Sequence, residues 1–231
     1  NRHPISDKIT GEIENIESIT KKELKGFYDN WYVPHNLLIS IAGNFDTQKI
    51  TESIEALLPK TKAEVRRVPR KPPQIESNDS YISGGFQQVQ LFTGVSFYTP
   101  KNIEEFYHLL VFSTIFGESM SSRLFQHIRE NRGFCYTIFS IRSFFTHTSM
   151  WAVYANTSPQ LLNQLIDALN LEFQNISQES PDQEEVDDAI SHLVGGTKLS
   201  QEDMETRMKR LVRHFLLGNE PCQRPIFVAG A

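Results

Sequence analysis

Two adjacent hydroxyl side chains are the first residues whose types could support catalysis. Ser121 and Ser122 would act as nucleophiles only beside a base that accepts the proton, and the sequence places no such base next to them. They precede a short apolar helical stretch, where serine commonly caps the first turn. Residues 117–122 also lack the G-K-[ST] ending of a phosphate-binding loop. This segment therefore predicts helix capping and not nucleophilic or phosphate chemistry.

Acidic and histidine side chains could bind a metal ion. The acidic residues form one run, which consists of Asp182, Glu184, Glu185, Asp187 and Asp188. This run begins an amphipathic stretch, and a helix dipole favours acidic side chains at that end, so we interpret it as a solvated helix N-terminus and not as a cation site. His108, His192 and His214 lie in helical segments, where we expect them to pack or to face solvent.

Composition narrows the functional classes. The 231 residues are 39% hydrophobic and 22% charged, which is typical of a soluble globular protein. The net charge of -5 argues against a nucleic-acid partner. The sequence contains no run of about 18 apolar residues, so it predicts no membrane-spanning helix. Cys135 and Cys222 form no C-x-x-C pair, and so low a cysteine count fits a reducing compartment.

The first 80 residues predict two helices around one strand. Thr20 to Glu23 is a capping-box pattern that opens a helix, which Pro34 stops. Leu37–Ala42 is a short apolar run that predicts a buried strand, and Thr47 can cap a second helix. Residues 59–80 are rich in Lys, Arg and Pro, which predicts a linker.

The remaining residues predict a mixture of strands and helices. Residues 89–97 alternate in polarity with a period of two, as in a strand, and two more strands are expected near 134–141 and 149–156. Helices are expected over 102–116 and about 121–130. Three amphipathic helices follow, with apolar stripes at 162–173, 186–194 and 204–216. The order has no regular β-α-β alternation, so it predicts an α+β fold with helices on one face of a largely antiparallel sheet.

Two separated motifs resemble the insulinase-like (pitrilysin) family of zinc metallopeptidases. The stretch from Ser121 to Phe125 reads S-S-R-L-F, and the stretch from Arg129 to Tyr136 is similar to R-E-x-R-G-x-x-Y. The earlier part also matches the family, at His3-Pro4, Gly11, Glu14, Thr20, Phe27, Tyr32, Pro34, Asn36 and Gly43-Asn44. The resemblance covers roughly residues 1–217 and implies a fold like that of insulinase and mitochondrial processing peptidase.

The resemblance implies a zinc site in the parent protein but none in this chain. The family binds zinc through H-x-x-E-H and a further glutamate. The closest match here is His127 to Glu130, which is followed by Asn131 where the second histidine should stand. The family's ligands lie upstream of the segment that begins at His3. We therefore expect the chain alone to bind no catalytic zinc and to be inactive.

The resemblance also assigns a role to an arginine and a tyrosine seven residues apart. Family members supply such a pair from the partner domain, and Arg129 and Tyr136 match it. A guanidinium can bind a substrate carbonyl or carboxylate, and a phenol can donate to a developing oxyanion. The alternative is structural: Arg129 and Arg132 would favour a helix C-terminus, and Tyr136 would be an ordinary strand residue.

The resemblance predicts a division of the chain and a set of partners. Residues 1–58 would end a preceding domain, 59–80 would form the linker, and 81–231 would form the partner domain. Because no strand like Leu37–Ala42 follows Gly218, that domain would either be incomplete at its C-terminus or pair with the first half-domain. Its partners would be a peptide substrate and a zinc-binding domain or subunit of the same family, in a homo- or heterodimer where they are separate chains. Any targeting segment would lie outside this chain.

Three functions remain open at this point. The favoured one is the non-zinc-binding half of a zinc-dependent metalloendopeptidase. The second is a non-catalytic homologue that serves as a binding or assembly subunit. The third is an α+β interaction module unrelated to peptidases, which requires both motifs to be coincidental.

Overall fold

The computed structural model describes residues 3–58, 71–77, 79–100, 102–145 and 147–216. The chain divides into two compact units. The first comprises Asn1–Lys71 and Leu199–Ala231, and the second comprises Pro72–Lys198. The predicted linker at 59–80 lies mostly outside the described residues, and so does everything after residue 216.

The first unit is built from short helices. These are α1 (Ile13–Ser18), α2 (Lys21–Trp31), α3 (Thr47–Leu57) and α7 (Met204–Leu216), with 3-10 turns at Pro4–Ser6 and Pro34–Asn36. The predicted capping box at α2 is confirmed: Thr20 Oγ1 accepts a hydrogen bond from Glu23 N, and the Glu23 carboxylate accepts one from Thr20 N. The prediction that Thr47 caps α3 is wrong, because Asp46 accepts hydrogen bonds from the first-turn amides and Thr47 is already helical.

The predicted strand at Leu37–Ala42 is not formed. Among the described residues no strand pairs with this segment, and it carries no regular secondary structure. An apolar run becomes a strand only where a neighbouring strand supplies hydrogen-bonding partners. Its recorded side-chain hydrogen bond runs instead to a helix, from Ser40 Oγ to the carbonyl of Met208 in α7.

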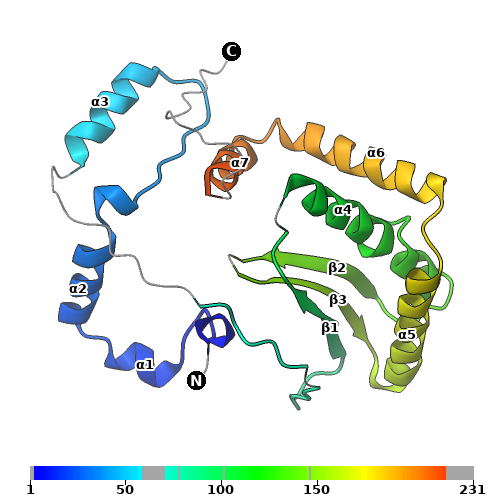
Figure 1. The fold of residues 1–231 in the computed structure, drawn as a ribbon. Helices are drawn as coiled ribbons and strands as arrows, with labels where there is room; N and C mark the ends of the chain where they lie inside the picture. Colours follow the sequence, from blue (N-terminus) through cyan, green and yellow to red (C-terminus); the bar gives the residue numbers. More distant parts are fainter. Residues whose placement is uncertain (1–2, 59–70, 78, 101, 146, 217–231) are drawn as a thin grey trace. The chain divides into compact units, whose positions relative to one another are not determined.

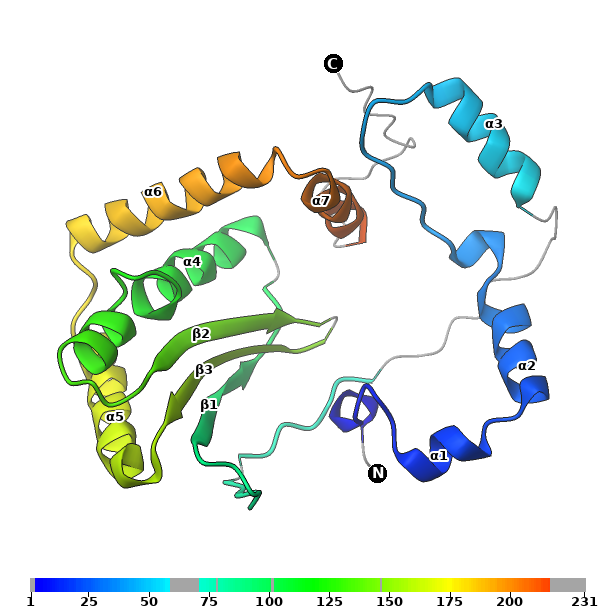
Figure 2. The same cartoon turned by 180° about the vertical axis from the view of Figure 1, so that it is seen from behind.

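The second unit is a three-stranded antiparallel sheet with helices on one face (Figures 1 and 2). Its strands are β1 (Val89–Phe97), β2 (Thr137–Phe144) and β3 (Ser149–Thr157), in the order β1-β3-β2. Its helices are α4 (Ile103–Ser113), α5 (Leu162–Gln178) and α6 (Gln183–Ser200), with π-helical segments at Thr114–Glu118 (η3) and Phe125–Glu130 (η4) and a 3-10 turn at Pro159–Leu161. The predicted α+β class is confirmed.

The core lies between β3 and the helices. Trp151, Val153 and Ala155 alternate along β3 and face the buried side, opposite Leu91 of β1 and Ile138 of β2. The helical segments contribute the following buried residues to this core: Phe116, Leu124, Ile128, Leu165, Ala168 and Leu169. The predicted apolar stripes of 121–130 and 162–173 therefore supply the core.

The η3 segment brings the chain unusually close to β2. A Cβ atom on Gly117 would lie 2.8 Å from the backbone nitrogen of Ser140 and 3.0 Å from Leu124 Cδ1. Ser140 Oγ in turn lies 3.0 Å from Ser113 Oγ, which accepts a hydrogen bond from Trp151 Nε1. The missing side chain of Gly117 therefore lets η3 pack directly on β2.

Candidate functional site

The motif segment runs from Arg123 to Tyr136 and includes η4. Its backbone is wider than an α-helix, because Asn131 N donates to Gln126 O, five residues back. Gly133, with φ +63°, reverses the chain, and its amide donates to Arg129 O. Glycine suits this left-handed position because it has no Cβ.

The structure brings Arg129 and Tyr136 together across this turn. The guanidinium carbon of Arg129 lies 5.8 Å from the centre of the Tyr136 ring and 4.5 Å from the centre of the Phe125 ring. Tyr136 stands just before β2 and not within it, but its amide still donates to Asn156 O of β3. The two candidate residues are therefore neighbours on the same turn.

Both candidate side chains reach solvent. Tyr136 is 78% exposed, and the Arg129 side chain is 33% exposed. Among the described residues, the Tyr136 hydroxyl has no hydrogen-bond partner, and Arg129 has one ion pair, a 4.0 Å contact with Glu130. A guanidinium held over aromatic rings keeps its N–H edge available for a carbonyl or carboxylate.

The other basic residues of the segment are bound to carboxylates. Arg123 donates to both oxygens of Glu185 at the start of α6, at 2.6 and 2.7 Å. The Arg123 hydrogen bonds lower the pKa of the Glu185 carboxyl, and those same bonds raise the pKa of Arg123. This bidentate pair fixes the beginning of the motif segment to α6.

Glu172 of α5 holds two further basic residues. Its carboxylate is almost fully buried, with 3% of the side chain exposed. One oxygen lies 3.0 Å from His127 Nδ1, and the other lies 3.8 Å from Arg132 Nη1. Burying a carboxylate is costly unless it is paired, so these contacts account for its position in the core. They also tie the middle of η4 and the turn that follows it to α5.

Sequence patterns did not reveal these two acidic partners. Glu185 lies 62 residues from Arg123, and Glu172 lies 45 residues from His127. The acidic run was interpreted as a solvated helix start, and this is confirmed for Asp182, which accepts a hydrogen bond from Glu185 N. Nothing in the run distinguishes Glu185 as the partner of a distant arginine.

The hydroxyls and the thiol of the segment show no sign of nucleophilic activation. Ser121 Oγ lies 3.0 Å from Ser119 Oγ, and Ser122 Oγ has no hydrogen-bond partner among the described residues, so the predicted helix capping by these side chains is wrong. Burial raises the pKa of the Cys135 thiol to about 11. A thiol with so high a pKa stays protonated at neutral pH and is a poor nucleophile.

The described residues do not fit a zinc ion. No group of three or more His, Cys, Asp or Glu side chains in this part of the chain is arranged to hold a metal. His127, the first residue of the partial H-x-x-E pattern, contacts the buried Glu172 instead. Zinc needs a set of three or four nitrogen, sulfur or carboxylate ligands.

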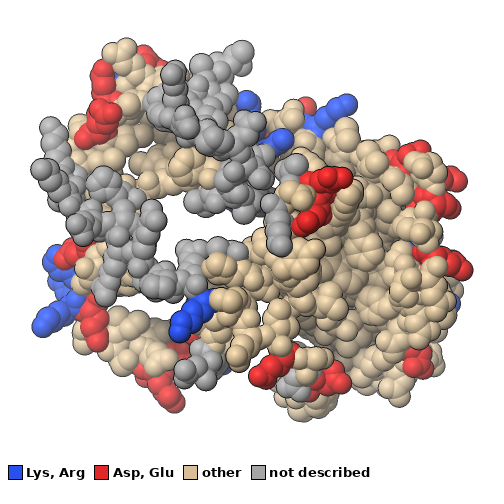
Figure 3. Space-filling model, viewed as in Figure 1, with Lys and Arg blue, Asp and Glu red and all other residues tan. Residues whose placement is uncertain are grey.

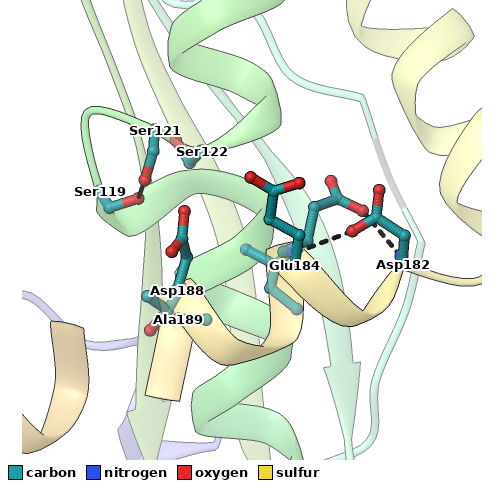
Figure 4. Close-up of a pocket in the computed structure, with 10 residues that line it drawn as sticks. Ser119, Ser121, Ser122, Asp182, Glu184, Asp188 and Ala189 are labelled. Carbon is teal, nitrogen blue, oxygen red and sulfur yellow. Dashed lines mark hydrogen bonds between the residues drawn. The ribbon is translucent and has the colours of Figure 1, made fainter. Parts of the chain in front are cut away.

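Arg129 and Tyr136 do not line either of two surface pockets found in the described part of the second unit. One, of about 210 Å³, lies between the Ser119–Ser122 turn and the start of α6 (Figure 4). The other, of about 350 Å³, lies between the end of β1 and α4, beside Phe97 and His108.

Comparisons with known proteins agree with this architecture. Residues 18–193 match the family model described as the peptidase M16 inactive domain. An uncharacterized zinc protease of Rickettsia felis is 30% identical over 212 residues, which are 92% of this chain and 51% of that protein. The chain therefore spans about half the length of this relative.

Solved structures show the same fold. A protease from Helicobacter pylori superimposes with a TM-score of 0.72 at 18% identity, over 91% of this chain and 52% of that one. A peptidase M16 inactive domain from Pseudomonas fluorescens gives a TM-score of 0.65 at 20% identity, over 80% of this chain and 45% of that one.

In the described part of this chain, no helix is both long and apolar enough to cross a membrane.

Proposed function

This chain belongs to the peptidase M16 family, whose inactive domain it matches, and we propose that it forms the half of a zinc-dependent metalloendopeptidase that does not bind the zinc. The zinc is held by another part of the parent protein, in the same polypeptide or in a separate subunit. The chain itself provides surface for the peptide substrate. The name of the Rickettsia felis relative, a zinc protease, supports this proposal.

Arg129 binds the substrate in this proposal. The observation that carries it is the contrast between Arg129 and its basic neighbours: Arg123 and Arg132 face carboxylates of α6 and α5. Arg129 is held instead by Phe125 and Tyr136, whose rings orient the guanidinium without consuming its N–H donors. Those donors are suited to a peptide carbonyl or a carboxylate of the substrate.

Tyr136 donates a hydrogen bond to the oxyanion that forms when the peptide carbonyl is attacked. Its exposed ring and unpartnered hydroxyl leave the donor available. The hydrogen bond from its amide to Asn156 fixes the backbone at the edge of the sheet. A donor fixed in this way contributes about 2.7–4 kcal/mol of transition-state stabilisation in enzymes where one was removed.

The proposal includes a domain division and a set of partners. Residues 1–58 end the zinc-binding domain, and residues 81–231 form the partner domain. Residues 59–80 are the linker that connects the two domains. The peptide lies extended along a sheet edge, where main-chain hydrogen bonds add to its affinity. Among the described strands, β1 and β2 each have one neighbour and so present such edges. Pairing with a separate zinc-binding subunit makes a homo- or heterodimer.

Kinetics of the parent protein test these roles. We expect Tyr136→Phe to lower kcat on an internally quenched peptide about 100- to 1,000-fold. Arg129→Ala removes a charged donor, so we expect kcat/KM to fall about tenfold or more, with part of the loss restored by Arg129→Lys. Matched controls are Tyr107→Phe on α4 and Arg207→Ala on α7, which remove the same groups from exposed residues elsewhere.

Two outcomes would contradict the proposal in different ways. If the parent cleaves peptides and the Arg129 and Tyr136 variants behave like the controls, the two residues have no catalytic role. If neither the coding sequence before Asn1 nor a subunit that co-purifies with the parent protein contains H-x-x-E-H with a later glutamate, the chain belongs instead to a binding or assembly subunit.

A further inference from the structure

We propose that Glu172 of α5 is a positioning residue for Arg129, which fixes the segment that carries the guanidinium without contacting the substrate. Its carboxylate lies against His127 and Arg132, which precede and follow Arg129 in the sequence. The inference rests on the role proposed above for Arg129. It adds a residue outside the motif segment on which that role depends.

Glu172 stands at a position where α5 is otherwise apolar. Leu165, Ala168 and Leu169 form the buried stripe of this helix, and Glu172 continues the stripe at helical spacing. Among the described residues, it is the one charged residue that is buried. The other acidic residues described in the second unit are at least partly exposed, and red side-chain atoms stand at the surface in Figure 3.

Stability of the fold does not explain why this position carries a carboxylate. Both of its partners keep access to water, since 46% of the His127 side chain and 36% of the Arg132 side chain are exposed. Water would therefore satisfy them if the residue at position 172 were apolar. Replacing buried ionic groups by apolar side chains of similar volume is often neutral or stabilising. A charge that breaks the apolar pattern at little benefit to stability is typical of functional sites.

The carboxylate restrains the chain on both sides of Arg129 with separate oxygens. Glu172 Oε2 lies 3.0 Å from His127 Nδ1, and Oε1 lies 3.8 Å from Arg132 Nη1. Ile128, which precedes Arg129, is fully buried and fixes the segment from the core. Rotation of η4 about its axis would therefore break a contact to α5.

Tyr136 is held by a different element. Its amide donates to Asn156 O of β3, and among the described residues it makes no hydrogen bond to Glu172. The distance of 5.8 Å between the Arg129 guanidinium carbon and the centre of the Tyr136 ring therefore depends on two anchors. Glu172 anchors η4, and Asn156 anchors the residue that precedes β2. Loss of the first anchor would displace the guanidinium relative to the phenol.

Amide hydrogen exchange of the 231-residue chain tests the anchor without any catalysis. In Glu172→Met we expect the amides of Asn131 and Gly133, which close the end of η4 and the glycine turn, to exchange about tenfold faster or more. The amide of Val153 in β3 should keep its rate, and the melting temperature should be maintained or rise. Asp167→Asn, at an exposed position of α5, is the matched control and should change none of these quantities.

Kinetics of the parent protein test the link to Arg129. Glu172→Met should lower kcat/KM on an internally quenched peptide about tenfold, since a displacement of about 1 Å can cost up to about 100-fold. Glu172→Gln keeps the shape of the side chain and one acceptor oxygen, so it should lose less. The double variant Glu172→Met/Arg129→Ala should be no slower than Arg129→Ala alone, because Glu172 acts through Arg129. A purely structural role would make the two losses multiply.

Three results would overturn the proposal. They are unchanged exchange of the Asn131 and Gly133 amides in Glu172→Met, multiplied losses in the double variant, and a lower melting temperature in both Glu172 variants. The exchange rates separate this proposal from the proposed function. If Arg129→Ala impairs cleavage while the exchange is unchanged, the role of Arg129 stands and Glu172 does not position it. If the exchange is faster while Arg129→Ala leaves cleavage unchanged, the role of Arg129 is wrong and Glu172 still positions its side chain.

Discussion

The ion pair between Arg123 and Glu185 should stabilise the second unit measurably. It joins the start of the motif segment to α6 across 62 residues of sequence, with both guanidinium contacts under 2.8 Å. The Arg123 side chain is 14% exposed and that of Glu185 is 30% exposed. The pair is therefore intermediate between a surface salt bridge and a buried one.

The expected magnitude follows from the geometry. A hydrogen bond to a charged group contributes about 1.5–3 kcal/mol, whereas a solvent-exposed ion pair contributes about 0–1 kcal/mol. Two such bonds are made here, but partial exposure of Glu185 lets water replace part of the lost interaction. We therefore expect Arg123→Leu to lower the free energy of unfolding by about 2 kcal/mol.

A double-mutant cycle separates the pair from other effects of the substitutions. Glu185→Gln removes the charge but keeps a side-chain oxygen for the amide of Asp182, which Glu185 now accepts at 3.1 Å. Urea unfolding of the wild type, the two single variants and the double variant then gives the coupling energy. We expect about 1–2 kcal/mol, because a glutamine still accepts one hydrogen bond from Arg123.

The same pair predicts a pH dependence. Arg123 lowers the pKa of Glu185 in the folded protein below its unfolded value of about 4.3. The unfolded chain therefore takes up the proton first as the pH falls, so this carboxylate stabilises the fold fully above that value. Its contribution is lost as the pH falls through the folded pKa. Glu185→Gln should show a shallower loss of stability in this acid range.

A coupling energy below about 0.5 kcal/mol would refute this reasoning, because that is the value of an exposed pair. An acid unfolding profile of Glu185→Gln parallel to that of the wild type would refute the pKa argument. The first result would mean that packing of Leu124 and Ile128 alone positions the motif segment.

Two further predictions concern the core beneath this segment. Gly117→Ala should destabilise the protein by about 1–3 kcal/mol in urea unfolding, because the new methyl group would meet the backbone of Ser140; Gly196→Ala in α6, where a Cβ has open space, should instead be neutral or stabilising by up to about 1 kcal/mol. In a Cys222→Ser background, Cys135 should react with a thiol reagent at pH 8 far more slowly in the folded than in the unfolded protein, because a pKa of about 11 leaves roughly one thiol in a thousand ionised. Equal rates in the two states would contradict this.

The sheet and its helices were largely predictable because their signals are local. The alternation over 89–97 gave β1 with its observed bounds, and the apolar stripe beginning at Leu162 gave α5. Periodicity records which side of an element is buried. It does not record what an element pairs with, which is why Leu37–Ala42, apolar but without a partner strand among the described residues, was predicted wrongly.

The π-helical backbone of η3 and η4 could not be predicted from the pattern. The same apolar residues fit an α-helix, and the difference lies in backbone hydrogen bonds that reach five residues back, such as the one from Asn131 N to Gln126 O at the end of η4. Widened turns of this kind arise from tertiary contacts and often occur at functional sites. Here Leu124 and Ile128 are fully buried, so the core fixes the geometry that the local sequence leaves open.

Motif spacing predicted the proximity of the candidate pair, but it did not predict the tertiary contacts that anchor the segment around it. The proximity of Arg129 to Tyr136 depends on seven residues and one glycine turn, so it was accessible from the sequence. The anchoring of Arg123, His127 and Arg132 depends on two carboxylates that are distant in the sequence, so it could not be predicted from the motif.

The contrast between Arg129 and the anchored Arg123 gives a physical reason to prefer a binding role for Arg129 over a purely structural one. An arginine that served only the fold would gain most from a carboxylate, as Arg123 does with Glu185, because bidentate pairing satisfies its donors. Arg129 lies six residues after Arg123. Its guanidinium carbon is 4.5 Å from the centre of the Phe125 ring, and its Nε is 4.0 Å from the Glu130 carboxylate. Its aromatic contacts restrict its position while leaving donors unsatisfied, which is how a protein prepares a group for a ligand.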